Sequence, residues 1–277
     1  MTARDGFLVA DSITEVGPEA RGRTVLAASH GGAYAGHVAA ELGVSAVILN
    51  DAGVGLDRAG IASLANLQRL GIAAATVGNR TARIGDGADC VQRGRISYAN
   101  ELAARLGVAP GMPVREALER LDAKRAHITL SPGHHDEARR MLSPSEDGGP
   151  AVWILDSVSL VADEDRNAIV VTGSHGGLLA GHPEVAIKKP VLGAIFNDAD
   201  RGMDDAGITR LAALDRHSVP CAAVSAWSAR IGDGASTYEQ GVISAMNATA
   251  ASLGAAIGMR TKDLVPLLRN ALKGRTV

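Results

Sequence analysis

The chain has 277 residues, with 28 basic and 30 acidic side chains, a formal net charge of −2 and 46% apolar residues. This composition is typical of a soluble globular chain that is long enough for one large domain or two smaller ones. The near-neutral charge and an aromatic content of 3% argue against a nucleic-acid partner, and the charge gives no attraction to an anionic membrane. We therefore expect neither nucleic acid nor a membrane as a partner.

The two cysteines and the N-terminal residues indicate the compartment. Cys90 and Cys221 are far apart and belong to no C-x-x-C pair, which argues against a zinc ribbon or a disulfide scaffold and favours a reducing cytoplasm. The N-terminal residues show no apolar run with a cleavage site, so no signal peptide is expected.

The uncharged stretch 242–259 is rich in Ala, Gly, Ser, Asn and Thr, which predicts a close-packed buried helix rather than a membrane span.

Nearly the whole chain is an internal repeat. The motif Ser29-His30-Gly31-Gly32 returns as Ser174-His175-Gly176-Gly177, a shift of 145 residues. After an insertion of two residues the shift is 147, and 30 of the 60 residues between positions 48 and 107 equal the residue 147 positions later. A period of this length exceeds that of solenoid repeats and indicates a duplicated domain or half-domain.

The repeat defines the predicted domains. We predict a first α/β repeat over residues 1–121, a linker over 122–150 and a second α/β repeat over 151–277. Turn-forming residues at 131–135 and 143–150 mark the linker as solvated. His134 and His135 fall in this linker and are predicted to be a solvated pair.

Within a copy, strands and helices alternate. Apolar periodicity, helix-capping residues and chain breakers define them. In chain order the first copy is predicted to have a strand over 7–13, a strand over 24–29, a helix over 34–42, a strand over 44–49, a helix over 60–70, a strand over 72–77, and helices over 97–106 and 114–121.

This order of elements predicts the fold. Strands joined by helices through short connections require right-handed crossovers and a parallel sheet that is covered on both faces. The segments 7–13 and 152–158 are predicted to pair antiparallel at a sheet edge, since only a short turn would separate each from the next strand. The predicted architecture is a tandem duplication of a βαβαβα half, three-layered like Rossmann and flavodoxin folds, with pseudo-two-fold symmetry and an antiparallel edge strand in each half.

The repeated polar residues follow the ends of the predicted parallel strands. Ligands of open α/β sheets bind beyond these carboxyl ends. Three pairs of residues lie there at equivalent positions of the two copies, namely His30 and His175, Asp51 and Asp198, and Arg83 and Arg230. We expect these side chains to meet around one small-molecule site.

The His-Gly-Gly turns give the clearest chemical prediction. Imidazole titrates near neutral pH, so His30 and His175 are candidate general acids and bases. The glycines that follow them would expose backbone N–H groups to an oxyanion or a carboxylate, unless they serve only to form the turn. These predicted donors are Gly31, Gly32, Gly176 and Gly177.

Further residues are predicted to support the histidines. Asp51 and Asp198 would orient them, as a carboxylate does in hydrolytic triads, although such residues after a strand also form turns and cap helices. No G-x-S-x-G elbow surrounds the serines next to the histidines, which argues against a serine nucleophile. The remaining predicted substrate contacts in these loops are Ser29, Ser174, Asn50 and Asn197.

The loops after the third parallel strand are predicted to anchor the substrate. Arg83 and Arg230 would each clamp a carboxylate in a bidentate manner, or would instead pair with Asp86 and Asp233 three residues later. Trp227 of the second copy would add a flat apolar wall and make the site asymmetric.

These residues favour an enzyme. The chain has no Walker A, Rossmann glycine, H-E-x-x-H or kinase motif, so no cofactor is predicted; a divalent metal bound by the repeated His and Asp residues is an alternative. The predicted reaction is hydrolysis of an amide or cyclic amide of a small anionic metabolite. Isomerisation, racemisation or elimination by the paired histidines is one alternative, and a non-catalytic small-molecule-binding protein is another. A homo-oligomer is also expected.

Overall fold

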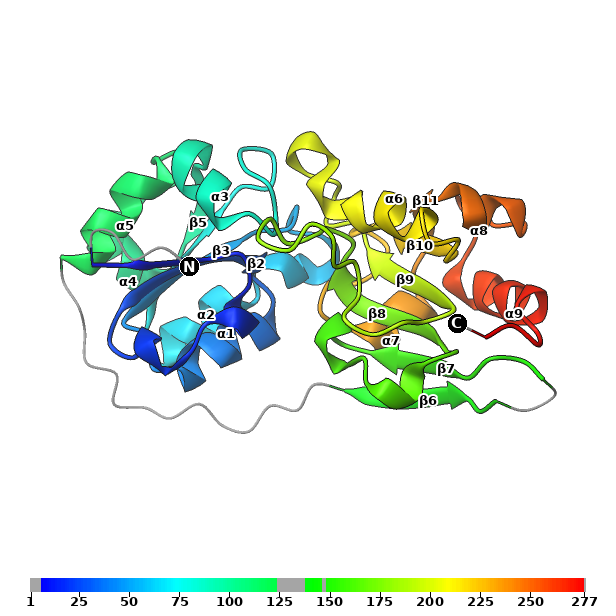
Figure 1. Ribbon diagram of the computed structural model, residues 1–277. Helices are drawn as coiled ribbons and strands as arrows, with labels where there is room; N and C mark the ends of the chain where they lie inside the picture. Colours follow the sequence, from blue (N-terminus) through cyan, green and yellow to red (C-terminus); the bar gives the residue numbers. More distant parts are fainter. Residues whose placement is uncertain (1–5, 124–137, 146–147, 277) are drawn as a thin grey trace.

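The computed structural model describes residues 6–123, 138–145 and 148–276. In these residues the chain forms two lobes that lie side by side, each built on one β-sheet (Figure 1). The first sheet has five strands in the order β1-β2-β3-β4-β5, and the second has six in the order β11-β10-β9-β8-β7-β6. Two α/β halves with mostly parallel sheets confirm the predicted fold class.

The first half follows the predicted order closely. Most boundaries agree with the prediction to within two residues. Its strands and helices are β1 (Leu8–Ala10), β2 (Thr24–His30), α1 (Ala33–Glu41), β3 (Ala46–Asn50), α2 (Ser63–Arg69), β4 (Ala73–Val77), α3 (Gly87–Arg93), β5 (Ile96–Ala99), α4 (Glu101–Arg105) and α5 (Val114–Asp122), with short 3-10 helices η1 (Ile13–Glu15), η2 (Pro18–Ala20) and η3 (Leu56–Ile61).

The second half repeats this order with two changes, an added strand β6 and a missing helix after β8. Its elements are β6 (Arg139–Ser143), β7 (Val152–Leu155), β8 (Ile169–His175), β9 (Gly193–Asn197), α6 (Thr209–Asp215), β10 (Cys221–Val224), α7 (Gly234–Glu239), β11 (Ile243–Met246), α8 (Ala248–Ser252) and α9 (Thr261–Ala271), with 3-10 helices η4 (Val158–Leu160), η5 (Asp163–Asp165) and η6 (Met203–Ile208).

Two stretches differ from their predicted state. Strand β6 lies inside the predicted linker and pairs antiparallel with β7, whereas His134 and His135 lie outside the described residues. The stretch 242–259 is not one helix, because residues 243–246 form β11. The side chain of the next residue, Asn247, accepts a hydrogen bond from the N–H of Ala250 and caps α8. None of the helices in the described part of the chain combines the length and the apolar character that a membrane crossing needs.

The edges of the sheets also differ from the prediction. Strands β1 and β7 pair parallel, not antiparallel, with β2 and β8. The reason is the connection, since residues 11–23 include two 3-10 helices and are long enough for a crossover. The antiparallel edge strands are instead β5 in the first half and both β11 and β6 in the second. The predicted helix over 97–106 therefore begins as a strand and becomes helical only after Asn100.

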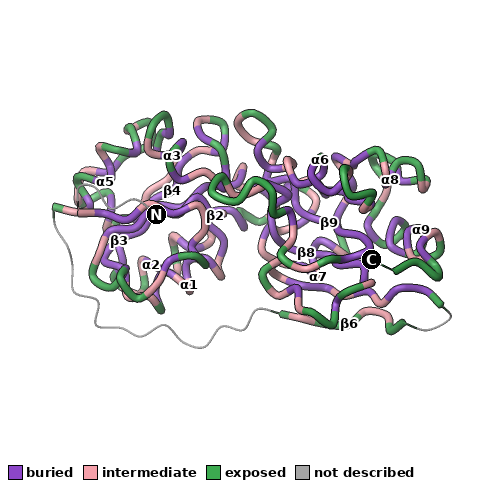
Figure 2. Tube along the Cα trace, viewed as in Figure 1, coloured by how far each residue is buried: buried purple, intermediate pink, exposed green. Residues whose placement is uncertain are grey.

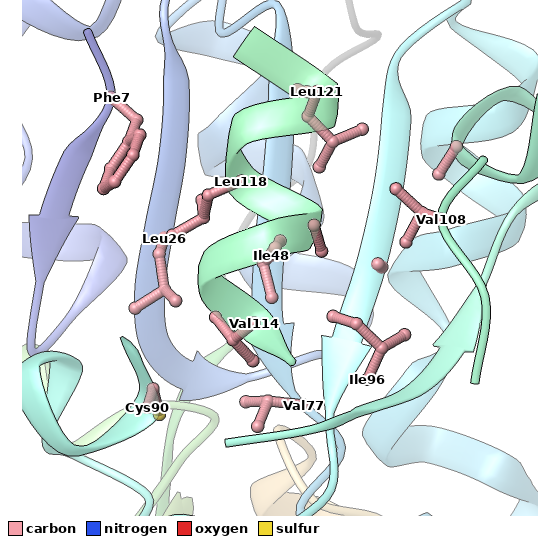
Figure 3. Close-up of a cluster of buried hydrophobic side chains, with 14 of the residues drawn as sticks. Phe7, Leu26, Ile48, Val77, Cys90, Ile96, Val108, Val114, Leu118 and Leu121 are labelled. Carbon is pink, nitrogen blue, oxygen red and sulfur yellow. The ribbon is translucent and has the colours of Figure 1, made fainter. Parts of the chain in front are cut away.

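Helices cover both faces of the first sheet. Helices α1 and α2 pack on one face through small and apolar side chains such as Ala39 and Leu67. On the other face Val114, Leu118 and Leu121 of α5 lie over the strands (Figure 3). The central strands β2–β4 and β8–β10 are therefore the most buried part of each lobe (Figure 2), and removal of this apolar surface from water stabilises the fold.

The second half lacks the counterpart of α1. Residues 178–192 form no helix, although the repeat predicts one. Pro183 stands at the position equivalent to Val38 in the middle of α1, and proline inside a helix removes a backbone hydrogen bond and clashes with the preceding turn. The segment instead reaches the first half, where the N–H of Ala180 donates to the carbonyl oxygen of Gly85 at 2.8 Å.

Equivalent loops of the two halves meet around a pseudo-two-fold axis. The N–H of Leu56 donates to the carbonyl of Ala226 at 2.8 Å, and the N–H of Met203 donates to the carbonyl of Asn79 at 2.7 Å. Positions 56 and 203, and 79 and 226, are equivalent in the repeat, so each bond is the symmetry mate of the other. A small apolar cluster between the halves consists of three further equivalent pairs, Ala52 and Ala199, Ala59 and Ala206, and Ile84 and Ile231.

Candidate functional site

The two repeated histidines meet in one cavity between the halves. His30 is the last residue of β2 and His175 is the last residue of β8. Both strands run parallel to a central neighbour, so each histidine lies at the carboxyl edge of its sheet. A cavity of about 540 Å³ is lined by both side chains. The structure therefore brings this predicted pair together.

Each ring is held in the same way by its own turn. The Nδ1 atom of His30 accepts a hydrogen bond from the N–H of Gly32 at 3.2 Å, and Nδ1 of His175 accepts one from Gly177 at 3.1 Å. A nitrogen that accepts a hydrogen bond carries no proton, so the neutral ring has its proton on Nε2. In the described part of the chain neither Nε2–H has a hydrogen-bond partner, which leaves both donors for a ligand.

The surroundings keep both rings neutral. Burial lowers the pKa of His30 to about 4. The pKa of His175 is held well below its usual range, first by burial and then by the positive charges of Arg210 and of protonated His30. Because a protonated ring would also lose the hydrogen bond from its glycine, the site favours the neutral form at neutral pH.

The paired glycines are required by packing. A Cβ atom at Gly31 would lie 2.6 Å from the carbonyl oxygen of Gly60, and one at Gly32 would lie 2.7 Å from Nδ1 of His30. In the second half a Cβ at Gly177 would lie 2.9 Å from Nδ1 of His175. Any larger residue would displace the imidazole or the adjacent loop, so these glycines fix the position of the histidines.

The amides of these glycines are not free donors. Besides the two bonds to the histidines, the N–H of Gly31 donates to the carbonyl of Asn50 at 2.6 Å, and the N–H of Gly176 donates to the carbonyl of Asn197 at 2.9 Å. All four amides that the sequence suggests for an oxyanion are thus bound within the chain. The expectation of a backbone oxyanion site is not met in this arrangement.

Asp51 and Asp198 are buried and hold loops rather than histidines. Oδ1 of Asp51 accepts hydrogen bonds from the N–H groups of Gly53 and Asn79. In the same way Oδ1 of Asp198 accepts from backbone N–H groups, and its Oδ2 accepts from the hydroxyl of Ser244 at 2.6 Å. The Nδ1 atoms that such carboxylates would orient are themselves acceptors, so the structure does not form the predicted triad.

The asparagines and serines of these motifs also form local contacts. Oδ1 of Asn50 accepts from the N–H of Ala52 and Oδ1 of Asn197 from that of Ala199, each at 2.9 Å, which stabilises the loops after β3 and β9. The hydroxyls of Ser29 and Ser174 line the cavity and accept hydrogen bonds from the N–H groups of Ile13 and Val158, at 2.9 and 2.8 Å. The serines therefore anchor the segments that follow β1 and β7.

Three other predicted contacts lie outside the cavity lining. Arg83 pairs with Asp204 at 2.7 Å and Arg230 pairs with Asp57 at 3.0 Å, so both bridge the two halves. The indole N–H of Trp227 donates to Asp200 at 3.3 Å, and 59% of this residue is exposed. The two arginine pairs lie at the interface between the halves, and Trp227 contacts a residue of its own half, so none of the three is placed at the histidines.

Sequence reasoning missed several charged or aromatic residues of the cavity, one of them Asp156. Glu15 and Tyr34 come from the first half, and Lys188 and Arg210 from the second. Arg210 had a signal in the repeat, because it stands where the first copy has Ser63. Lys188 lies in the segment whose helix is lost, which no periodicity predicts.

The described residues contain no group of three or more His, Cys, Asp or Glu side chains that would hold a metal ion. The metal arrangement suggested by the repeat required both aspartates beside the histidines, and these are bound in their own loops.

No protein-family model, curated protein or solved structure matches the chain. The site is therefore interpreted from its own geometry.

Proposed function

We propose that this chain is an enzyme of small-molecule metabolism whose substrate binds in the cavity between the two halves. The reaction that we put first is hydrolysis of an amide or cyclic amide of a small anionic metabolite. The observation that carries the proposal is the meeting of His30 and His175, from equivalent positions of the repeat, in one cavity.

The neutral rings are suited to stabilise a negative charge on oxygen. When water attacks an amide, charge develops on the carbonyl oxygen, and hydrogen-bond donors that are already oriented stabilise it. The Nε2–H of His30 or of His175 would be such a donor, since Nδ1 is held by the glycine N–H. This role takes the place of the backbone amides, which are occupied.

The second histidine would move the protons. It accepts the proton of the attacking water at Nε2 after its own proton has moved to Nδ1. This tautomer leaves the glycine N–H without its acceptor, at a cost of about 1 to 3 kcal/mol. Burial makes the resulting imidazolium a strong acid, because it lowers the pKa of both rings. The imidazolium then protonates the leaving nitrogen, and the C–N bond breaks to give a carboxylic acid and an amine.

The test is turnover of a panel of small amides, lactams, imides and other cyclic amides that carry a carboxylate, followed by NMR. We expect His30→Ala and His175→Ala each to lower turnover by about 10²- to 10⁴-fold. His217→Ala is the matched control, because this histidine is exposed and lies outside the cavity. Ligand binding without turnover of any panel member would contradict the proposal and favour a binding protein.

Isomerisation or elimination is the second candidate. It is favoured by the origin of the histidines on opposite halves, since one ring would then remove a proton from carbon and the other would return it. In D2O this reaction places deuterium on the substrate carbon, whereas hydrolysis does not. Deuterium incorporation that depends on both His30 and His175 would replace the first proposal with this one.

We also propose a reducing, cytoplasmic setting, because Cys90 and Cys221 are both buried and unpaired. The homo-oligomer expected from the sequence stays a prediction, which light scattering on the purified protein would test.

A further inference from the structure

Arg210 is a buried cation in the wall of the cavity. It lies in the first turn of α6, where the first half has Ser63, and only 7% of the residue is exposed. The absence of a helix at 178–192 in the second half leaves room for this long side chain beside His175. The two halves of the cavity therefore differ in charge at this position.

The contacts of Arg210 hold its guanidinium without neutralising it. Nε donates to the carbonyl oxygen of Gly177 at 2.8 Å and Nη1 donates to the carbonyl oxygen of Ala186. The guanidinium carbon lies 5.6 Å from the centre of the Phe196 ring. Among the described residues no carboxylate lies within 4.0 Å of Arg210, and Nη2 has no hydrogen-bond partner.

A buried charge without a counter-ion is unfavourable. Burial lowers the pKa of Arg210 to about 10, so the group stays protonated at neutral pH and keeps its full charge. Removing a cation from water costs several kcal/mol unless a counter-ion and hydrogen bonds compensate it. An anionic ligand at Nη2 would supply both.

The other charged residues of the lining agree with an anion at this end. Lys188, an exposed residue of the same wall, adds a second cation. The carboxylate of Asp156 is already bound by the N–H groups of Gly234 and Ala138. Glu15 comes from the other half of the cavity, where its carboxylate lies 3.9 Å from His182.

We propose that Arg210 and Lys188 form the subsite for a carboxylate group of the substrate. A carboxylate fits better than a phosphate, because phosphate sites usually use free backbone N–H groups and the glycine amides next to this wall are occupied. The inference rests on the proposed function in that it uses the same cavity. It fixes the end of the cavity that holds the anionic group, and it leaves the reacting carbonyl near the histidines.

The test is calorimetric titration of the full chain with malonate, with neutral malonamide and with inorganic phosphate at constant ionic strength. We expect malonate to bind at least about 10-fold more tightly than malonamide, and Arg210→Met to weaken malonate binding by about 10- to 100-fold. Lys188→Met, an exposed change that does not threaten folding, should weaken it by up to about fivefold. Arg216→Met is the matched control, because Arg216 is exposed at the C-terminal end of the same helix.

Equal binding of malonate and malonamide by the wild type, or wild-type affinity in Arg210→Met and Lys188→Met, would overturn the subsite. Tighter binding of phosphate than of malonate would overturn the choice of a carboxylate. Turnover is not part of this measurement. A protein that binds malonate through Arg210 but hydrolyses no amide would therefore refute the proposed function and leave the subsite in place.

Discussion

Arg83 of the first half and Asp204 of the second half form an ion pair of 2.7 Å, and their equivalents Arg230 and Asp57 repeat it at 3.0 Å. Both pairs are partly exposed at the surface of the interface between the halves. The arginines that the sequence suggests as substrate clamps thus bridge the two halves, whose opposed edges form the cavity. These ion pairs join the two halves that carry His30 and His175.

The variant Arg83→Ala distinguishes a clamp that binds the substrate from a bridge between the two halves. A clamp that bonds a substrate carboxylate would raise KM by about 10- to 100-fold when removed. As a bridge, Arg83 should change KM by less than about threefold and should lower the urea midpoint at low salt, with a difference that shrinks as salt screens exposed charges.

The control for this variant is Arg105→Ala, which removes an exposed pair with Glu101 inside α4, at 3.6 Å, and touches no interface. Steady-state kinetics and urea titrations at low and high salt make the comparison. A large rise in KM for Arg83→Ala at unchanged stability would restore the clamp.

Gly32→Ala tests whether the turn holds the imidazole. The added Cβ would lie 2.7 Å from Nδ1 of His30 and 3.6 Å from the nearest backbone oxygen, so the ring must move while the backbone stays. We expect the pKa of His30 to rise from about 4 toward its usual value, and turnover to fall by about 10²-fold. NMR titration of the imidazole protons measures the first effect.

Gly78→Ala is the matched glycine, because its Cβ would meet neighbours at an ordinary 3.6 Å. It should keep the wild-type titration of His30. If the His30 pKa of Gly32→Ala also stays near the wild-type value, the ring is held by something other than this turn.

The repeat explains why much of the fold was predictable. Two copies of one pattern show the same strand-helix order, and the boundaries of β2, α1, β4 and α5 agree with the pattern. The elements that were predicted wrongly depend on tertiary contacts. Strand β5 is four residues long and is defined by pairing with β4, so its sequence alone did not distinguish it from the start of α4. The lost helix after β8 coincides with Pro183 at the position of Val38 and with a second proline, Pro190, in the same segment.

The candidate site was predictable only in part. The strand-end rule placed His30 and His175 on sheet edges, and the structure brings them into one cavity. The rule does not distinguish polar groups near a strand end that are free to bind a ligand from those that form hydrogen bonds within the chain. Asp51, Asp198 and the glycine amides are bound by their own loops. The repeated motifs do not predict Arg210, because the first copy has Ser63 at its position.

Cys90 and Cys221 should not react in the folded protein. Both thiols are buried, and burial raises the pKa of each, so the reactive thiolate is scarce at neutral and mildly alkaline pH. We expect slow labelling by a thiol reagent such as DTNB in buffer and rapid labelling of two thiols per chain in urea. Rapid labelling of the native protein would show that one of these thiols is exposed, and would reopen the question of a cysteine nucleophile.

The buried histidines should make stability depend on pH. In the unfolded chain His30 takes up a proton near pH 6.5, whereas in the folded chain it does so only near pH 4. Between these values the unfolded state binds more protons, so the free energy of unfolding is highest above pH 6.5 and falls as the pH is lowered toward 4. His175 acts in the same direction, and each histidine contributes at most about 1.4 kcal/mol per pH unit. Urea unfolding at a series of pH values across this window measures the slope. His30→Gln should make it shallower, and an identical slope in this variant would mean that His30 titrates alike in both states.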